Sequence, residues 1–500
     1  MLLRPSKKDY AAILHYSGQI VAGFGITMLL PLATAFAYRE WNMASAFALA
    51  MSTCFLFWLV TDRFFYTKRE LTWFTGMLVV TLSWALAVTF GAIPFRLSGF
   101  YASFVDATFD VMSGFTTTGL TLIQDLDHAP YSLHMWRQGL QFLGGQGIIV
   151  LALTFLVRSL RGAVKVYVGE AREEKLVPSV RSTAVAIWVV SLTYLALGTI
   201  VLMIINLWSR MALDRAFLHA LWISMTAWGT GGYAPSSLST AYYHNVAAEF
   251  VIVCLMILGA INFVIHQAVW YGQRRELIQN FELRTFSAVV LFTFTLTYLG
   301  LGRSDAFGSL ASRFRMALFH LISAQTDTGF MSIPSFALKH YWGDFATMAL
   351  IIAMSIGGLA CSTAGGIKAM RVGLAIKGIV LEVRKIMSPE RGVVYEYYHH
   401  VRQHILKDNQ VKMVGLIALA YVSTYLSGAL VGLVYGFPLV DSLFESVSAT
   451  ANVGLTIGIT SPALPVFMKM FYILQMWVGR LEFTAVFVLA GFLVALARGR

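Results

Sequence analysis

The stretch SGFTTTGLT, from Ser113 to Thr121, is polar and carries two glycines, although apolar runs of membrane-spanning length lie on both sides of it. Irregular backbone inside a bilayer leaves N–H and C=O groups without partners, unless the segment is buried in protein or lines a water-filled path. This stretch therefore predicts a segment that enters the membrane partway and lines a polar path.

Three further segments share the pattern of this stretch when all four are aligned on one glycine. Each has an aromatic residue ten positions before the glycine, Ser or Thr six before, a small residue five before and an apolar residue directly after. The aligned segments are MSGFTTTGLT (Met112–Thr121), MTAWGTGGYA (Met225–Ala234), ISAQTDTGFM (Ile322–Met331) and VSATANVGLT (Val447–Thr456). Their common register predicts four repeats of helix, re-entrant segment and helix.

The composition places these repeats in a membrane. The 500-residue chain is 58% hydrophobic and 12% charged, whereas soluble domains carry about 25% charged residues. Apolar runs of about 18 residues or more indicate transmembrane helices. We expect spans near 14–37, 43–61, 71–95, 133–157, 183–207, 246–270, 285–302, 345–367, 411–435 and 466–497.

The fold class predicted from these spans is an all-α polytopic membrane protein with four pore repeats around one axis. Two transmembrane helices precede the repeats. The expected divisions are the leading helices in 1–70 and the pore repeats in 71–182, 183–284, 285–410 and 411–500.

The net charge of +12 reflects membrane orientation. Most of the 37 Lys and Arg residues lie in alternate connecting segments, and such segments face the cytoplasm. Both termini are therefore expected to be cytoplasmic, and no nucleic-acid partner is predicted. Cys54, Cys254 and Cys361 lie in apolar surroundings, which favours neither disulfides nor a zinc site.

Four re-entrant segments around one axis would present rings of backbone carbonyls that replace the hydration shell of a cation. Glycine suits such positions because an inward-pointing carbonyl often requires a positive φ. The C-terminal end of the preceding short helix adds a partial negative charge. The candidate cation ligands are Thr116, Thr117, Thr118, Gly119, Thr230, Gly231, Gly232, Thr326, Asp327, Thr328, Gly329, Ala451, Asn452, Val453 and Gly454.

The four segments resemble the filter repeats of the Trk/Ktr/HKT superfamily of potassium transporters, and the details resemble its Trk branch. Three other stretches share the resemblance, with Gln146 in place of a more usual methionine: WRQGLQFLGGQGIIV (Trp136–Val150), SIGGLACSTAGGIKAMR (Ser355–Arg371) and MWVGRLEF (Met476–Phe483). The resemblance covers essentially the whole chain.

The resemblance implies potassium transport through a single-chain, pseudo-tetrameric pore in the bacterial or archaeal cytoplasmic membrane. It also implies a homodimer surrounded by membrane lipid, with no organic cofactor in this chain. A separate cytoplasmic ring of nucleotide-binding subunits is the implied regulator. Relatives that admit sodium often carry serine at the first filter glycine, so Gly119 favours potassium.

The stretch from Ser355 to Gly366 interrupts an apolar span and contains two glycine pairs, Gly357–Gly358 and Gly365–Gly366. Glycine pairs are places where helices break or hinge, so we expect an intramembrane gating loop. Arg480 is its expected partner, because a charge in an apolar span should face a cavity or bind a polar group. The alternative is a structural ion pair between Arg480 and Glu482.

The basic cytoplasmic segments 158–182 and 368–412 are expected to dock the regulatory partner, the alternative being a solvated positive surface. The second segment includes YEYYHH (Tyr395–His400), interpreted as a solvated or partner-binding face.

Two other functions stay open. One is a sodium or mixed-cation channel or symporter of the same fold. The other is a membrane-embedded enzyme, which is disfavoured because Asp327 is the one acidic residue in the four segments and no histidine accompanies it.

Overall fold

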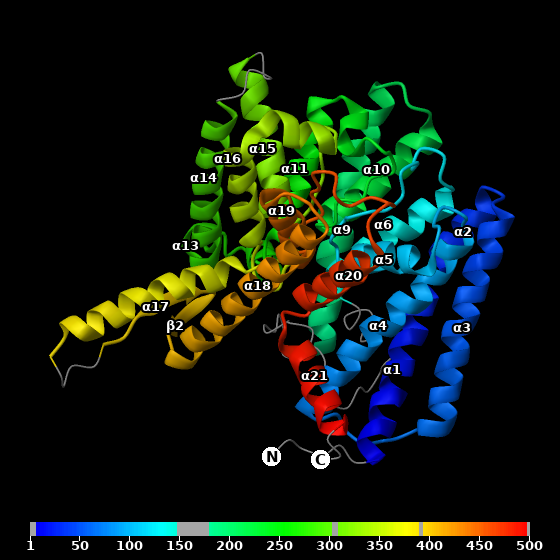
Figure 1. Cartoon of the computed structure of the whole chain (residues 1–500), viewed down its shortest axis with the longest axis horizontal. Coiled ribbons are helices and arrows are strands. Elements are labelled where there is room, and N and C mark those ends of the chain that lie inside the picture. The colour runs from blue at the N-terminus through cyan, green and yellow to red at the C-terminus, as the bar shows by residue number, and fades with distance from the viewer. Residues whose placement is uncertain (1–6, 148–179, 303–308, 390–393, 498–500) are drawn as a thin grey trace.

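The computed structural model describes residues 7–147, 180–302, 309–389 and 394–497 (Figure 1). The helices are α1 (Lys7–Thr27), α2 (Leu29–Ala37), α3 (Trp41–Phe65), α4 (Trp73–Leu97), α5 (Phe104–Phe115), α6 (Tyr131–Gln146), α9 (Val180–Trp208), α10 (Leu213–Trp228), the 3-10 helix η1 (Ser239–Tyr243), α11 (Val246–Ala260), α12 (Phe263–Trp270), α13 (Glu276–Gln279), α14 (Phe281–Leu301), α15 (Leu310–Gln325), α16 (Ser335–Ser355), α17 (Ala369–Met387), α18 (Asp408–Val434), α19 (Leu439–Thr450), α20 (Val466–Arg480) and α21 (Thr484–Ala497).

The described helices confirm a multi-pass membrane protein. Six helical stretches are long and apolar enough to cross a bilayer: Lys8–Ala37, Trp41–Phe65, Trp73–Leu97, Ala184–Trp208, Phe281–Leu301 and Asp408–Val434. Two helix pairs, α11 with α12 and α20 with α21, have the same apolar character but bend by 101° and 116°. The second half of the expected span 133–157 lies outside the described residues.

The expected spans 246–270 and 466–497 are therefore corrected, because each is interrupted by a sharp bend. The Asn262 side chain accepts a hydrogen bond from the Val264 N–H and starts α12 in a new direction. Glu482 and Phe483 adopt positive φ angles of 49° and 68°, which non-glycine residues rarely adopt within a helix. These conformations end α20 before α21 begins.

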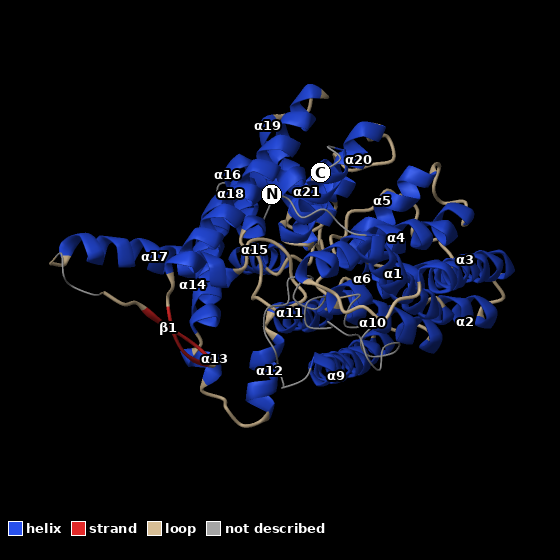
Figure 2. Cartoon of the chain, turned by 90° about the horizontal axis from the view of Figure 1, so that it is seen from below, coloured by secondary structure: helices blue, strands red, loops and turns tan. Residues whose placement is uncertain are grey.

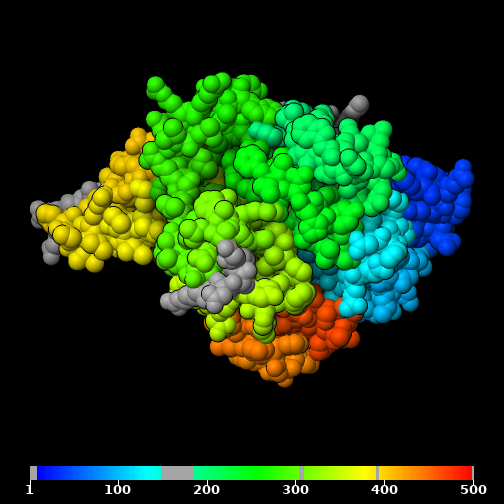
Figure 3. Space-filling view, turned by 90° about the horizontal axis from the view of Figure 1, so that it is seen from above, coloured from blue at the N-terminus to red at the C-terminus, as the bar shows by residue number. Residues whose placement is uncertain are grey.

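The repeats form a closed ring. A short helix, α5, α10, α15 or α19, precedes each re-entrant segment (Figure 1). The helix that follows each segment packs against the short helix of the next repeat: α6 against α10, α11 against α15, α16 against α19 and α20 against α5. The last contact joins the fourth repeat to the first. The leading helices α1 and α3 lie at one edge of the molecule, opposite the projecting α17 (Figure 3).

A small antiparallel hairpin is the departure from an all-α fold within the described residues. It pairs β1 (Tyr397–His400) with β2 (Arg402–Ile405) between α17 and α18 (Figure 2). Tyr398 and His400 are buried, and His399 Nε2 lies 2.9 Å from Glu276 Oε1. The interpretation of Tyr395–His400 as a solvated or partner-binding face is therefore corrected for Tyr398 and His400, which pack against the chain near α13, whereas Tyr395 and Tyr397 are exposed.

Candidate cation site

The four re-entrant segments share one backbone conformation. Each filter glycine has a positive φ: 92° at Gly119, 76° at Gly232, 85° at Gly329 and 91° at Gly454. Two positions earlier, φ is again positive, at Thr117 (59°), Thr230 (47°), Asp327 (54°) and Asn452 (61°). Positive φ is uncommon for non-glycine residues, and strained backbone of this kind clusters at functional sites. Its recurrence at one register position in all four repeats points to a shared role.

The N-terminal part of each re-entrant segment, its inner end, is held by the preceding short helix through an equivalent backbone hydrogen bond. The residue before each filter glycine donates its N–H to the carbonyl six positions before that glycine, over 2.8–2.9 Å. The pairs are Thr118 with Ser113, Gly231 with Thr226, Thr328 with Ser323 and Val453 with Ser448. In a trans peptide the C=O points away from the N–H. The carbonyls of Thr117, Thr230, Asp327 and Asn452 therefore point away from the short helices.

The four segments also meet one another in sequence around the ring. A Cβ placed on each filter glycine would collide with a backbone carbonyl oxygen of a neighbouring repeat, that of the residue directly before the filter glycine. The distances from the added Cβ to this oxygen would be 2.3 Å for Gly119 and Gly231, 2.0 Å for Gly232 and Thr328, 2.0 Å for Gly329 and Val453, and 2.0 Å for Gly454 and Thr118. The structure thus brings the fifteen candidate ligands into one ring, and all of them are buried except Gly119 and Gly232, which are partly exposed.

Two side chains of the ring make contacts beyond it. Asn452 donates to the Thr118 hydroxyl at 3.0 Å and so joins the fourth and first repeats. The carboxylate of Asp327 accepts a hydrogen bond at 3.3 Å from the Gly358 N–H. Asp327 therefore links the ring to the segment that follows α16.

The segment between α16 and α17, residues 356–368, lies directly against the ring. A Cβ on Gly357 would approach Asp327 Oδ2 to 2.1 Å, and a Cβ on Gly365 would approach the Ala451 carbonyl oxygen to 2.1 Å. Gly366 has a positive φ of 63°. The glycines are needed here because no larger residue fits between the loop and the filter segments.

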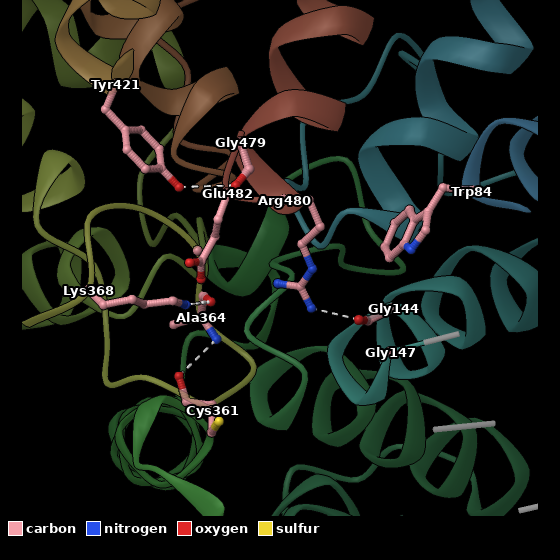
Figure 4. Close-up of a pocket in the computed structure, with 12 residues that line it drawn as sticks. Trp84, Gly144, Gly147, Cys361, Ala364, Lys368, Tyr421, Gly479, Arg480 and Glu482 are labelled. Atoms are coloured by element: carbon pink, nitrogen blue, oxygen red, sulfur yellow. Dashed lines mark hydrogen bonds between the residues drawn. The ribbon is translucent and has the colours of Figure 1, made fainter. Parts of the chain in front are cut away.

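Arg480, the last residue of α20, joins three parts of the site. Its Nη1 donates to the Thr117 hydroxyl at 3.2 Å and to the Thr363 carbonyl at 2.8 Å. Its Nη2 donates to the Gly144 carbonyl at 2.6 Å, as Figure 4 shows. The guanidinium therefore contacts the ring, the loop and the end of α6. Glu482, the partner in the ion-pair alternative, forms an ion pair with Arg371.

Two cavities lie beside the loop. The smaller, of about 30 Å³, borders Arg480 and Trp84 (Figure 4) and is large enough to hold water. The larger, of about 640 Å³, opens between α17, α18 and the hairpin. Cys361, Lys368 and Glu482 line both cavities, so these residues lie at the boundary between a narrow space and a wide one.

Sequence reasoning missed a residue that joins the first two repeats. Gln141 on α6 accepts the Tyr233 N–H at 2.9 Å and donates to the Gly231 carbonyl. One carbonyl of the ring therefore already has a protein donor. The available signal was the polar character of Gln141 in a stretch at membrane depth, where polar side chains commonly face the interior of a helix bundle.

Sequence reasoning also missed a contact between the loop and α14. The buried carboxylate of Glu282 accepts the Ala360 N–H at 2.5 Å. Its position at the start of an apolar helix gave no sign of this distant partner.

Membrane-spanning helices around four re-entrant segments define a polytopic membrane transport protein rather than an enzyme. The family model described as TrkH, cation transport protein, matches residues 45–494. The chain therefore belongs to the TrkH family of cation transport proteins.

Individual relatives match over nearly the whole chain. An uncharacterized cation transporter of Methanocaldococcus jannaschii is 32% identical over 490 residues, covering 98% of this chain and 97% of the relative. The Trk system potassium uptake protein TrkH of Halomonas elongata is 28% identical, covering 95% and 97%. The crystal structure of the potassium transporter TrkH from Vibrio parahaemolyticus superimposes with a TM-score of 0.80 at 26% identity, covering 96% of this chain and 98% of that one.

Proposed function

We propose that the protein takes up potassium across the cytoplasmic membrane through the ring of four re-entrant segments. The observation that carries this proposal is the fourfold register of positive φ angles and close carbonyl contacts. Carbonyl oxygens held in this way can replace the hydration shell of a cation. The names of the relatives from Halomonas elongata and Vibrio parahaemolyticus, a potassium uptake protein and a potassium transporter, support potassium as the transported ion.

The loop of residues 356–368 is the proposed gate, with Gly357, Gly358, Gly365 and Gly366 as its flexible points. Arg480 holds this loop in place through the Thr363 carbonyl and places a positive charge next to Thr117. The cavity of about 30 Å³ beside Arg480 supports a narrow passage at this level. Movement of the loop would join this space to the larger cavity on the side of α17 and α18.

The proposed orientation has both termini in the cytoplasm, and the proposed pore repeats are 71–182, 183–284, 285–410 and 411–500. A second copy of the chain is the proposed partner of α17, which projects from the body of the molecule (Figure 1). Its apolar stripe is exposed at Ile376, Ile379, Val383 and Ile386, a periodicity typical of a helix face that packs against another helix.

A cytoplasmic ring of nucleotide-binding subunits is the proposed regulator, and its docking surface is the segment 368–412. Part of the charge on this surface is already paired, since Lys377 and Arg384 both contact Glu396. Most of the other expected docking segment, 158–182, lies outside the described residues.

The test is ion flux into liposomes that contain the purified full-length protein. We expect potassium and rubidium to enter and sodium to be excluded. Equal potassium and sodium flux would support the alternative of a mixed-cation pore. Flux that requires a sodium or proton gradient would support a symporter.

A further inference from the structure

The residue nine positions before each filter glycine is a buried hydrogen-bond acceptor in three of the four repeats. It is Asp110 in the first repeat, His320 in the third and Glu445 in the fourth, whereas the second repeat has Ile223. All four lie in the short helices that precede the re-entrant segments. The function proposed above uses none of these side chains.

The first and fourth repeats use a carboxylate in the same way. Asp110 Oδ1 accepts the Leu122 N–H at 2.8 Å, and Glu445 Oε1 accepts the Ile457 N–H at 3.0 Å. Both N–H groups lie three residues after the filter glycine. Each carboxylate also accepts a hydroxyl two residues after that glycine, from Thr121 at 2.6 Å in the first repeat and from Thr456 in the fourth.

The third repeat makes the equivalent bond with a neutral group. His320 Nδ1 lies 3.0 Å from the Met316 carbonyl, which can only accept, so Nδ1 carries the ring proton. Nε2 is then the acceptor, and the Ser332 N–H donates to it at 3.4 Å. Ser332 again lies three residues after the filter glycine. The feature common to the three repeats is therefore an acceptor for this N–H and not a negative charge.

The second repeat lacks the acceptor for a reason that the sequence supplies. Three residues after Gly232 stands Pro235, and proline has no backbone N–H. A buried acceptor opposite it would have no donor, so an apolar Ile223 fits the position. The exception thus follows the same rule as the three other repeats, since an acceptor is present wherever there is an N–H to bind.

We propose that Asp110, His320 and Glu445 are positioning residues that determine ion selectivity by fixing the outer ends of their filter segments. The inner end of each segment is held by the backbone bond from the residue before the filter glycine. The hydrogen bond from the N–H three residues after the filter glycine, the outer tie, adds a second fixed point. The carbonyls between the two fixed points therefore keep their spacing. This inference rests on the proposed potassium-selective ring and names the residues that hold it in shape.

The experiment compares potassium and sodium flux in liposomes for wild type, Asp110→Ala, Asp110→Asn, Glu445→Ala and Glu445→Gln. The alanine variants lose the acceptor, whereas the amide variants keep one oxygen for the N–H. Each hydrogen bond that is lost corresponds to about a fivefold change in an equilibrium. The alanine variants lose the bond to the N–H together with the bonds to hydroxyls, so we expect them to lower the potassium-to-sodium ratio by about fivefold or more, and the amide variants to stay within about twofold of wild type.

The matched control is Ile223→Ala, which removes side-chain volume at the same position of the repeat that has no N–H to bind. It should leave the ratio unchanged. His320→Leu is the second test variant, because it removes the tie without removing a charge and is expected to fold even where the carboxylate variants do not. Deuterium exchange of the amides in 119–124 should accelerate in Asp110→Ala, whatever ion the pore passes.

Three results would overturn the positioning role: alanine variants with the wild-type ratio, amide variants as impaired as the alanine variants, or Ile223→Ala as impaired as both. Unaltered deuterium exchange in Asp110→Ala would also overturn it. A wild-type protein that passes sodium and potassium equally would instead contradict the proposed function, and deuterium exchange would still decide whether the tie exists.

Discussion

Replacing Gly119 with serine tests the contact between neighbouring filter segments. A Cβ at this position would lie 2.3 Å from the Gly231 carbonyl oxygen, whereas real Cβ atoms essentially never come closer than 3.0 Å. The ring must therefore open locally by about 0.7 Å, the difference between these two distances. The positive φ of 92° adds strain of about 1–3 kcal/mol for a residue with a side chain.

This strain should reduce the discrimination between potassium and sodium, because a displaced carbonyl no longer fits one ion better than the other. Since about 1.4 kcal/mol corresponds to a tenfold change, we expect the potassium-to-sodium flux ratio to fall about tenfold. The assay is flux of each ion into liposomes, normalised to the amount of folded protein.

Gly99→Ser is the matched control, because Gly99 has a similar φ of 83° but no atom within 4 Å of its added Cβ. The control should keep the wild-type ratio. A wild-type ratio in Gly119→Ser, or an equal loss in Gly99→Ser, would refute the argument that contact within the ring sets selectivity.

Arg480→Ala should raise basal potassium flux without lowering selectivity, because the loop loses its bond at the Thr363 carbonyl; wild-type flux in a folded variant would place the gate elsewhere. Deletion within residues 357–366 should likewise raise basal flux, measured in the same liposomes. Lys469→Met should lower the free energy of unfolding by about 3–5 kcal/mol, because the buried Asp106 carboxylate loses an ion pair of 2.6 Å. Adding Asp106→Asn should restore most of that loss in thermal unfolding, and no restoration would contradict an ion-pair effect.

The register of the four re-entrant segments could be predicted from sequence because it reflects a backbone requirement. Gly119 and its three counterparts adopt positive φ angles, which glycine adopts more readily than other residues. A glycine at this position in the sequence therefore predicts the backbone conformation. The glycine pairs of the loop are visible for a related reason, since Gly357 and Gly365 leave no room for a Cβ.

The partners of these segments could not be predicted, because many of them are backbone groups that any residue supplies. Asp110 is a conspicuous acid in an apolar region, yet its partner is the Leu122 N–H, which no sequence pattern marks. Gln141 reaches Tyr233 across 92 positions. The bend before α21 could not be predicted because it depends on the positive φ angles of Glu482 and Phe483, and neither residue type favours such a conformation.

The ion pair between Lys469 on α20 and Asp106 on α5 spans 363 positions of the chain. At a synthesis rate of about 5–20 residues per second, the first repeat waits roughly 20–70 s on the ribosome before the helix that completes the ring exists. During that time the Asp106 carboxylate has no Lys469, and the α5 surface that later packs against α20 is uncovered. The nascent chain therefore needs another component of the membrane, such as the insertion machinery or a lipid headgroup, to cover this surface until translation ends.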